Sequence, residues 1–149
     1  MDDAALGSLL SRLEQAEGPS RLLDAEIAVA IFRAADPDAL RAEAAESDCE
    51  PGTYWMVHRD GWRSLTTSQK YTSSLDAAMG LVPEGWFLKH LGERTREVMF
   101  VGDQHSFVGW EAEIQYRDGG GRLQGGCCEN REIALVIAAL KAHRARSER

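Results

Sequence analysis

The chain has 149 residues and a formal net charge of −7, and this length is typical of one domain with its own core. The negative charge argues against duplex DNA or RNA as a partner, because Lys and Arg supply most of the affinity for phosphates. No apolar run reaches the length of about 18 residues that a membrane span needs, so we expect no membrane partner. The acidic start, Met1-Asp2-Asp3, is unlike a signal peptide, which predicts a cytoplasmic protein with reduced cysteines.

Two amphipathic helices are predicted at the start of the chain. The apolar residues of the first, over residues 3–16, recur at helical spacing: Leu6, Leu9, Leu10 and Leu13. Gly18-Pro19 interrupts this pattern, and Ser20 is a suitable cap for a second helix that ends near Ala35. Residues 38–47 are rich in Ala and Glu, which predicts a short exposed helix or a loop. We expect residues 1–18 to form a partly separate helix, and residues 19–149 to form a single domain.

The rest of the chain changes to the two-residue period of strands. Arg59-Asp60-Gly61 lies between two β-prone runs, which predicts a hairpin. The clearest strand is FVGWEAEIQY at 107–116, with an apolar residue at every second position near its end. A glycine-rich turn at 118–121 predicts that residues 122–127 return beside it. A strongly apolar helix follows, with Asn130 as its cap.

These elements predict an α+β fold. One dry and one wet face per strand favour an antiparallel sheet, and the helices need that sheet to bury their apolar sides. We therefore expect a sheet of about four to five strands with helices on both faces, in α-β-α layers. The segment YTSSLDAAMGLVPEGW at 71–86 has a structural explanation within this fold. Ser73 and Asp76 have the spacing of a capping box, Pro83 ends a short helix, and Trp86 begins the next strand.

Three segments carry a resemblance to a known family: LLDAEIAVAIF, YTSSLDAAMGLVPEGW and ALVIAALKAH, in this order. With them the chain resembles small phage and prophage proteins of the phage ABA-sandwich domain type, over roughly residues 20–146. The resemblance implies α-β-α layering and an origin in a bacteriophage or mobile element, and thus a bacterial host cell. It implies no catalytic residues. The family often enters its last helix through Thr-Pro, and this chain departs from that pattern with CCENRE just before residue 132.

Thiol and metal chemistry have weak signals. Cys127 and Cys128 precede the last helix, where a helix dipole stabilises a thiolate, and His90 or His105 is a conceivable base. No motif links these residues, and Glu129 opposes a thiolate, so we expect no catalytic residue. The cysteines and histidines lack the spacing of a zinc site. We expect neither a metal nor a cofactor, and the glycines at 119–121 and 125–126 fit a hairpin better than a phosphate loop.

Aromatic and basic residues are mixed between residues 54 and 71. Such mixtures are typical of binding hot spots and of surfaces that stack on a nucleobase. A core role is the alternative for each aromatic residue. The candidate residues for binding a ligand or partner are Trp55, His58, Arg59, Trp62, Arg63, Lys70 and Tyr71.

The sequence therefore favours a non-enzymatic phage or prophage accessory protein that works by binding another protein. One alternative is a protein that sequesters a small nucleotide signal in a counter-defence role, with aromatic and Arg side chains converging in a pocket. A thiol-dependent enzyme is a second alternative. An assembly role through the first helix is a third, and a homo-oligomer is left open.

Overall fold

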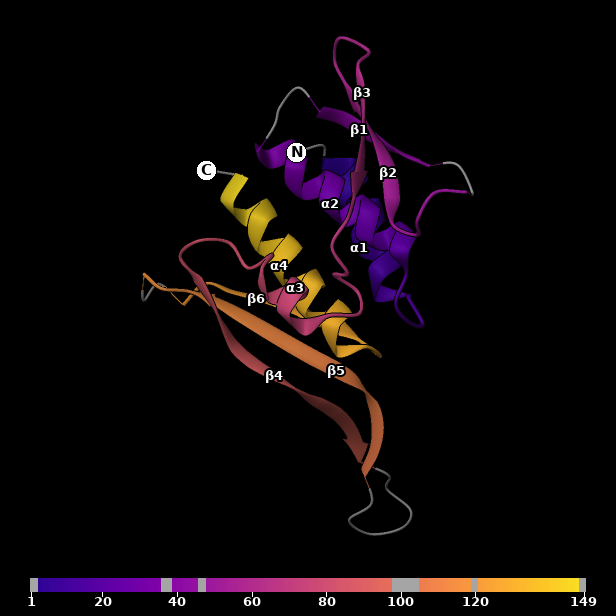
Figure 1. Cartoon of the computed structure of the whole chain (residues 1–149). Coiled ribbons are helices and arrows are strands. Elements are labelled where there is room, and N and C mark those ends of the chain that lie inside the picture. Colours follow the sequence, from indigo (N-terminus) through magenta and orange to yellow (C-terminus); the bar gives the residue numbers. More distant parts are fainter. Residues whose placement is uncertain (1–2, 36–38, 46–47, 98–104, 119–120, 148–149) are drawn as a thin grey trace.

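The computed structural model describes residues 3–35, 39–45, 48–97, 105–118 and 121–147, with four helices and six strands in these ranges (Figure 1). The helices are α1 (Asp3–Glu14), α2 (Arg21–Ala35), α3 (Leu75–Met79) and α4 (Arg131–Ser147). The strands are β1 (Ala39–Ala44), β2 (Thr53–His58), β3 (Arg63–Thr67), β4 (Trp86–Glu97), β5 (His105–Tyr116) and β6 (Leu123–Cys128). The predicted α+β class is confirmed. In these ranges, none of the helices has the length and apolar character required to cross a bilayer.

The strands form two antiparallel sheets, where the sequence predicts one sheet of four to five strands. Each sheet has three strands, in the orders β1-β2-β3 and β4-β5-β6. The predicted hairpin joins β2 to β3: the His58 N–H donates to the Trp62 carbonyl at 2.8 Å, and Gly61 has a φ of 85°. The return of β6 beside β5 is also confirmed.

The helices lie between the two sheets, which differs from the predicted α-β-α order. Helix α4 covers the β4-β5-β6 sheet, while α2 packs against β1 and β2, and α1 contacts both α2 and α4 (Figure 1). The four leucines of α1 share one core with α4: Leu6, Leu9, Leu10 and Leu13. The first helix is therefore part of the main core and does not stand apart, because its apolar side needs α4 to cover it. The domain boundary at residue 18 stays a prediction.

Strand β1 replaces the helix or loop predicted over residues 38–47. Its composition favours a helix, but its backbone pairs with β2 from Ala39 opposite His58 to Ala44 opposite Tyr54. Helix α2 packs against this strand. Pairing and packing with distant residues override the local preference, as is common for weak propensities.

Caps define three helix starts. The Ser20 Oγ accepts from the Leu23 N–H at 3.3 Å, and the Asn130 Oδ1 accepts from the Ile133 N–H at 3.0 Å, so both predicted caps are confirmed. The predicted capping box at Ser73 is wrong by one residue, because Ser74 caps α3. The N–H groups of Ser73 and Ser74 both bond to the Lys70 carbonyl, so a turn precedes the helix there.

Candidate functional site

Five of the seven predicted binding residues lie on the β2–β3 hairpin: Trp55, His58, Arg59, Trp62 and Arg63. Strand pairing divides four of them between two faces. Trp55 pairs with Leu65, and Val57 pairs with Arg63, so these side chains share the outer face of the sheet. His58 bonds to Trp62 across the hairpin and lies on the opposite face. The sequence-predicted cluster is therefore a hairpin with two distinct surfaces.

The outer face carries a preorganised arginine. The Arg63 Nη2 lies 2.8 Å from the Glu43 Oε2 of β1, and its Cζ lies 4.9 Å from the centre of the Trp55 ring. Glu43, Trp55 and Leu65 are direct neighbours across the three strands. An ion pair and a cation–π contact thus hold the guanidinium over the Trp55 ring. Leu65 is 50 % exposed beside them.

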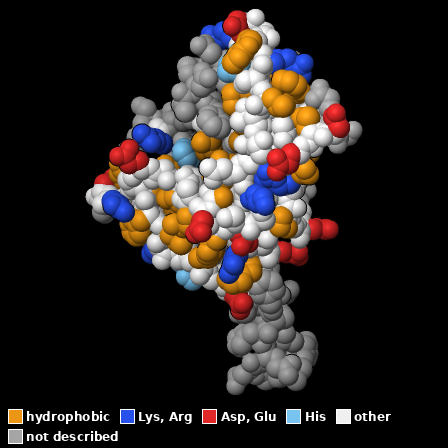
Figure 2. All heavy atoms as spheres, viewed as in Figure 1, with side chains coloured by type: hydrophobic (Ala, Val, Ile, Leu, Met, Phe, Trp, Pro, Cys, Tyr) orange, Lys and Arg blue, Asp and Glu red, His pale blue; other side chains and the backbone are white. Residues whose placement is uncertain are grey.

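Trp62 lies at the tip of the hairpin and is 62 % exposed. Its ring centre is 5.0 Å from that of His58, and the His58 Nε2 lies 3.2 Å from the Ser64 Oγ. The Asp60 Oδ1 accepts from the Trp62 N–H at 2.9 Å and holds the turn. Figure 2 shows hydrophobic side chains beside Lys and Arg side chains at the end of the molecule where Figure 1 places β3.

Lys70 and Tyr71 are not part of the hairpin surface. Lys70 is exposed in the loop before α3, whereas Tyr71 packs against the main core and against a second core that contains Tyr54. Burial, and then the nearby Asp24 carboxylate, raise the pKa of Tyr71. Burial and the neighbouring Tyr71 raise the pKa of Tyr54 to about 12. Both tyrosines therefore stay neutral at physiological pH and serve the core.

The adjacent cysteines lie at the end of β6 rather than on a helix. Cys127 is exposed, while Cys128 is buried with its Sγ 3.6 Å from the Leu13 carbonyl oxygen and 3.5 Å from that of Ala16. Carbonyl oxygens accept from a thiol and do not stabilise a thiolate. His90 is exposed on β4, opposite Glu113 of β5, and the side chain of His105 lies outside the described residues. In the same ranges, no three His, Cys, Asp or Glu side chains group as a metal site requires.

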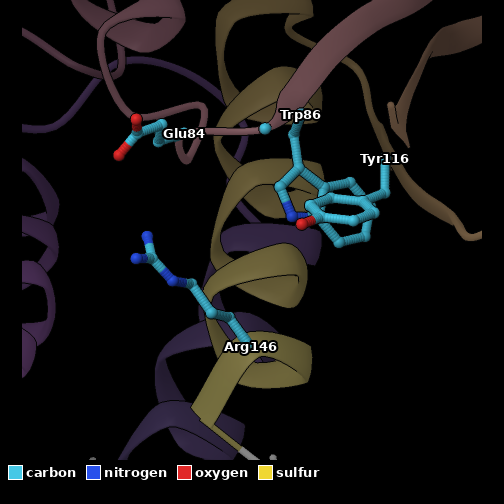
Figure 3. Close-up of a pocket in the computed structure, with 5 residues that line it drawn as sticks. Glu84, Trp86, Tyr116 and Arg146 are labelled. Atoms are coloured by element: carbon cyan, nitrogen blue, oxygen red, sulfur yellow. The ribbon is translucent and has the colours of Figure 1, made fainter. Parts of the chain in front are cut away.

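Sequence reasoning missed a pocket of about 460 Å³ on the other half of the molecule (Figure 3). Five residues from three segments line it: Glu84, Gly85, Trp86, Tyr116 and Arg146. The first three enter β4, Tyr116 ends β5, and Arg146 lies in the last turn of α4. The pairing of Trp86 with Tyr116 brings the first two segments together, and the packing of α4 on the sheet adds Arg146. No local pattern in the sequence indicates these contacts.

Aromatic contacts fix the walls of this pocket. The ring centres of Trp86 and Tyr116 lie 5.5 Å apart with a tilt of 59°, and the Arg122 Cζ lies 5.6 Å from the Tyr116 ring centre. Gly85 has a φ of 86°, and a Cβ there would lie 2.7 Å from the Tyr116 Cε2. A glycine is therefore required at this position, because both its conformation and its lack of a side chain let the Tyr116 ring lie against the backbone.

His143 lies one turn before Arg146 on α4. Its Nε2 is 2.8 Å from the Leu81 carbonyl oxygen, so this nitrogen carries the proton and donates it. Burial lowers the pKa of His143, and the positive charge of Arg146 lowers it further, against the effect of the Leu81 hydrogen bond. The imidazole is therefore neutral at pH 7, and its hydrogen bond to Leu81 holds the segment that precedes Glu84.

Comparison of the chain with protein-family models, with curated proteins and with solved structures finds no match. The resemblance to the phage ABA-sandwich family stays a prediction, and the observed order of layers differs from the order that the resemblance implies.

Proposed function

We propose that this protein is a non-enzymatic accessory protein that binds another protein through its β2–β3 hairpin. The observation that carries the proposal is the exposure of Leu65 beside Arg63 on the outer face, with the exposed Trp62 at the tip of the same hairpin. Trp and Arg dominate the energetics of protein interfaces, and they act best when held in place before binding. Arg63 contacts both Glu43 and Trp55, so part of its side-chain freedom is lost before a partner binds.

The partner adds an extended segment beside β3. In the described part of the chain, β3 is the last strand of its sheet, with one edge open. A short edge strand of this kind offers backbone donors and acceptors to a partner strand, and neighbouring side chains then give specificity. An apolar side chain in the partner meets Leu65 on the outer face, and an acidic one meets Arg59 at the turn.

A paired set of variants tests this proposal. Partner proteins are captured with the intact chain, with a Trp62→Ala/Arg63→Ala variant, and with a Phe87→Ala/Lys89→Ala variant. The Phe87→Ala/Lys89→Ala variant is the control, because it also removes one exposed aromatic and one exposed basic side chain, but on β4. Circular dichroism confirms that each variant is folded.

The hairpin variant is expected to lower the affinity of the captured partner by at least about ten-fold, as loss of a hot spot does, while the β4 variant retains it. Amide hydrogen exchange then shows protection of β3 in the complex. Equal binding by all three proteins, or equal loss in both variants, contradicts the proposal.

A further inference from the structure

The Trp86–Tyr116 pocket presents one positive and one negative charge beside two aromatic rings. Figure 3 shows the Glu84 carboxylate and the Arg146 guanidinium turned toward the same space, with the rings of Trp86 and Tyr116 to one side of them. Glu84 comes from the loop before β4, and Arg146 from the end of α4. Two charges of opposite sign therefore approach one pocket from different segments.

A ligand that satisfies both charges is itself a zwitterion. A guanidinium binds a carboxylate through two parallel hydrogen bonds, and a carboxylate binds an ammonium group as an acceptor. A purely anionic ligand meets repulsion from Glu84, and a purely cationic one meets repulsion from Arg146. The charges thus select a molecule that carries both an ammonium and a carboxylate.

The walls of the pocket select an apolar side chain for the same molecule. Tyr116 is the ring that a ligand can reach, because it is half-buried, whereas Trp86 is only 5 % exposed and supports the Tyr116 ring at 5.5 Å between ring centres. Rigid rings favour another planar ring in a tilted or offset arrangement. A volume of about 460 Å³ lies in the range of small-molecule sites.

From these features we infer that the pocket binds a free α-amino acid with an aromatic side chain. The α-carboxylate pairs with Arg146, the α-ammonium pairs with Glu84, and the ring lies against Tyr116. This site uses the β4-β5-β6 half of the molecule and does not depend on the β2–β3 hairpin. The two proposals can therefore fail separately.

Three related compounds test the inference by isothermal titration on the full chain. L-Phenylalanine carries both charges, 2-phenylethylamine lacks the carboxylate, and 3-phenylpropionate lacks the ammonium. L-Phenylalanine is expected to bind roughly ten-fold more tightly than either analogue, as expected for loss of one charge-assisted hydrogen bond.

Two variants assign the charges. Arg146→Gln is expected to lower the affinity for L-phenylalanine by about ten-fold and to leave the affinity for 2-phenylethylamine unchanged. Glu84→Gln is expected to lower the affinity for L-phenylalanine and to leave the affinity for 3-phenylpropionate unchanged. Arg131→Gln, at the other end of α4, and Glu17→Gln, in an exposed loop, are the matched controls. All four positions are exposed, so the variants are expected to fold, and thermal melting checks this.

The inference is overturned by equal affinities for the three compounds, or by losses in the control variants that match those in Arg146→Gln and Glu84→Gln. Absence of L-phenylalanine binding at its solubility limit also overturns it, and Glu84 and Arg146 are then ordinary surface charges. None of these outcomes bears on the test of protein binding through the β2–β3 hairpin.

Discussion

Arg21 connects the start of α2 to both ends of the β2–β3 hairpin. Its guanidinium donates to the carbonyl oxygens of Pro51, Ser68 and Gln69 at 3.2, 2.8 and 3.1 Å. It also lies 2.6 Å from the Oδ2 of Asp24, which is fully buried and accepts from a backbone N–H as well. One side chain thus holds the two segments that flank the hairpin, which fixes the base of the hairpin against the start of α2.

Titration of His143 is expected to make the stability of the folded chain depend on pH. The ordinary pKa of histidine is 6.5, and burial lowers the pKa of His143 in the folded protein. The unfolded chain therefore binds a proton more readily than the folded chain does, and the free energy of unfolding rises with pH in the window between the lowered pKa and 6.5. This stability is fully present above pH 6.5 and is lost as the pH falls through the pKa of the folded state.

The measurement is urea unfolding of the intact chain and of His143→Gln between pH 5 and pH 8. Glutamine retains a donor for the Leu81 carbonyl but does not titrate. The intact chain is expected to lose more stability than the variant as the pH falls below 6.5. Equal slopes in the two proteins show that another group controls this pH range.

Helix α4 lies directly on the backbone of β6, and Gly126 makes this possible. A Cβ at Gly126 would lie 2.1 Å from the Ala134 carbonyl oxygen and 2.8 Å from the Ala138 nitrogen. These atoms belong to the helix backbone, so no side-chain rotation relieves the contact. The nearest atom to a Cβ at the adjacent Gly125 is 3.8 Å away, on β5.

Gly126→Ala is therefore expected to push α4 away from the sheet and to lower the free energy of unfolding by about 2 kcal/mol or more, in the range of overpacked cores. Gly125→Ala is the matched control, and its expected effect is within about 0.5 kcal/mol because its side chain points to solvent. Chemical denaturation of both variants measures the difference. If the two variants are equally stable, α4 does not depend on this close approach.

The sequence pattern predicted those turns and helix caps that depend only on residues close in sequence. The turn at Asp60-Gly61 and the caps at Ser20 and Asn130 were predictable because each depends on residues next to it. Strand β1 was not, since its pairing with β2 depends on residues across a separate loop. The glycines at 125–126 lie in the predicted return strand, but the close approach of α4 to Gly126 depends on distant residues and could not be predicted.

The candidate site was predictable to the same extent. Trp55, Trp62 and Arg63 are close in sequence, so their nearness on a hairpin followed from the turn. Their division between two faces depends on register. The pocket at Trp86 is lined by residues as distant in sequence as Glu84 and Arg146, which approach it only after β4, β5 and α4 have packed.

At the scale of the whole molecule, the two sheets are joined through the helices that lie between them. Helix α1 contacts α2, α4 and β6, so it links the half that carries the hairpin to the half that carries the pocket. If α1 were a separate helix, changes to its apolar side would leave the rest of the chain unaffected. Its position in the main core predicts the opposite.

Leu13→Ala tests this arrangement, because Leu13 is 0 % exposed between α1 and α4, whereas Leu22 on α2 is 57 % exposed. Leu13→Ala is expected to lower the free energy of unfolding by about 2–5 kcal/mol, the range for a buried leucine that leaves a cavity, and Leu22→Ala by less than about 0.5 kcal/mol. Thermal melting is followed in the near ultraviolet, where the tryptophans of both sheets report. A single transition that moves to lower temperature in Leu13→Ala shows that α1 stabilises both halves together. An unchanged midpoint, or a shift that Leu22→Ala reproduces, shows that the chain folds without the contact between α1 and α4.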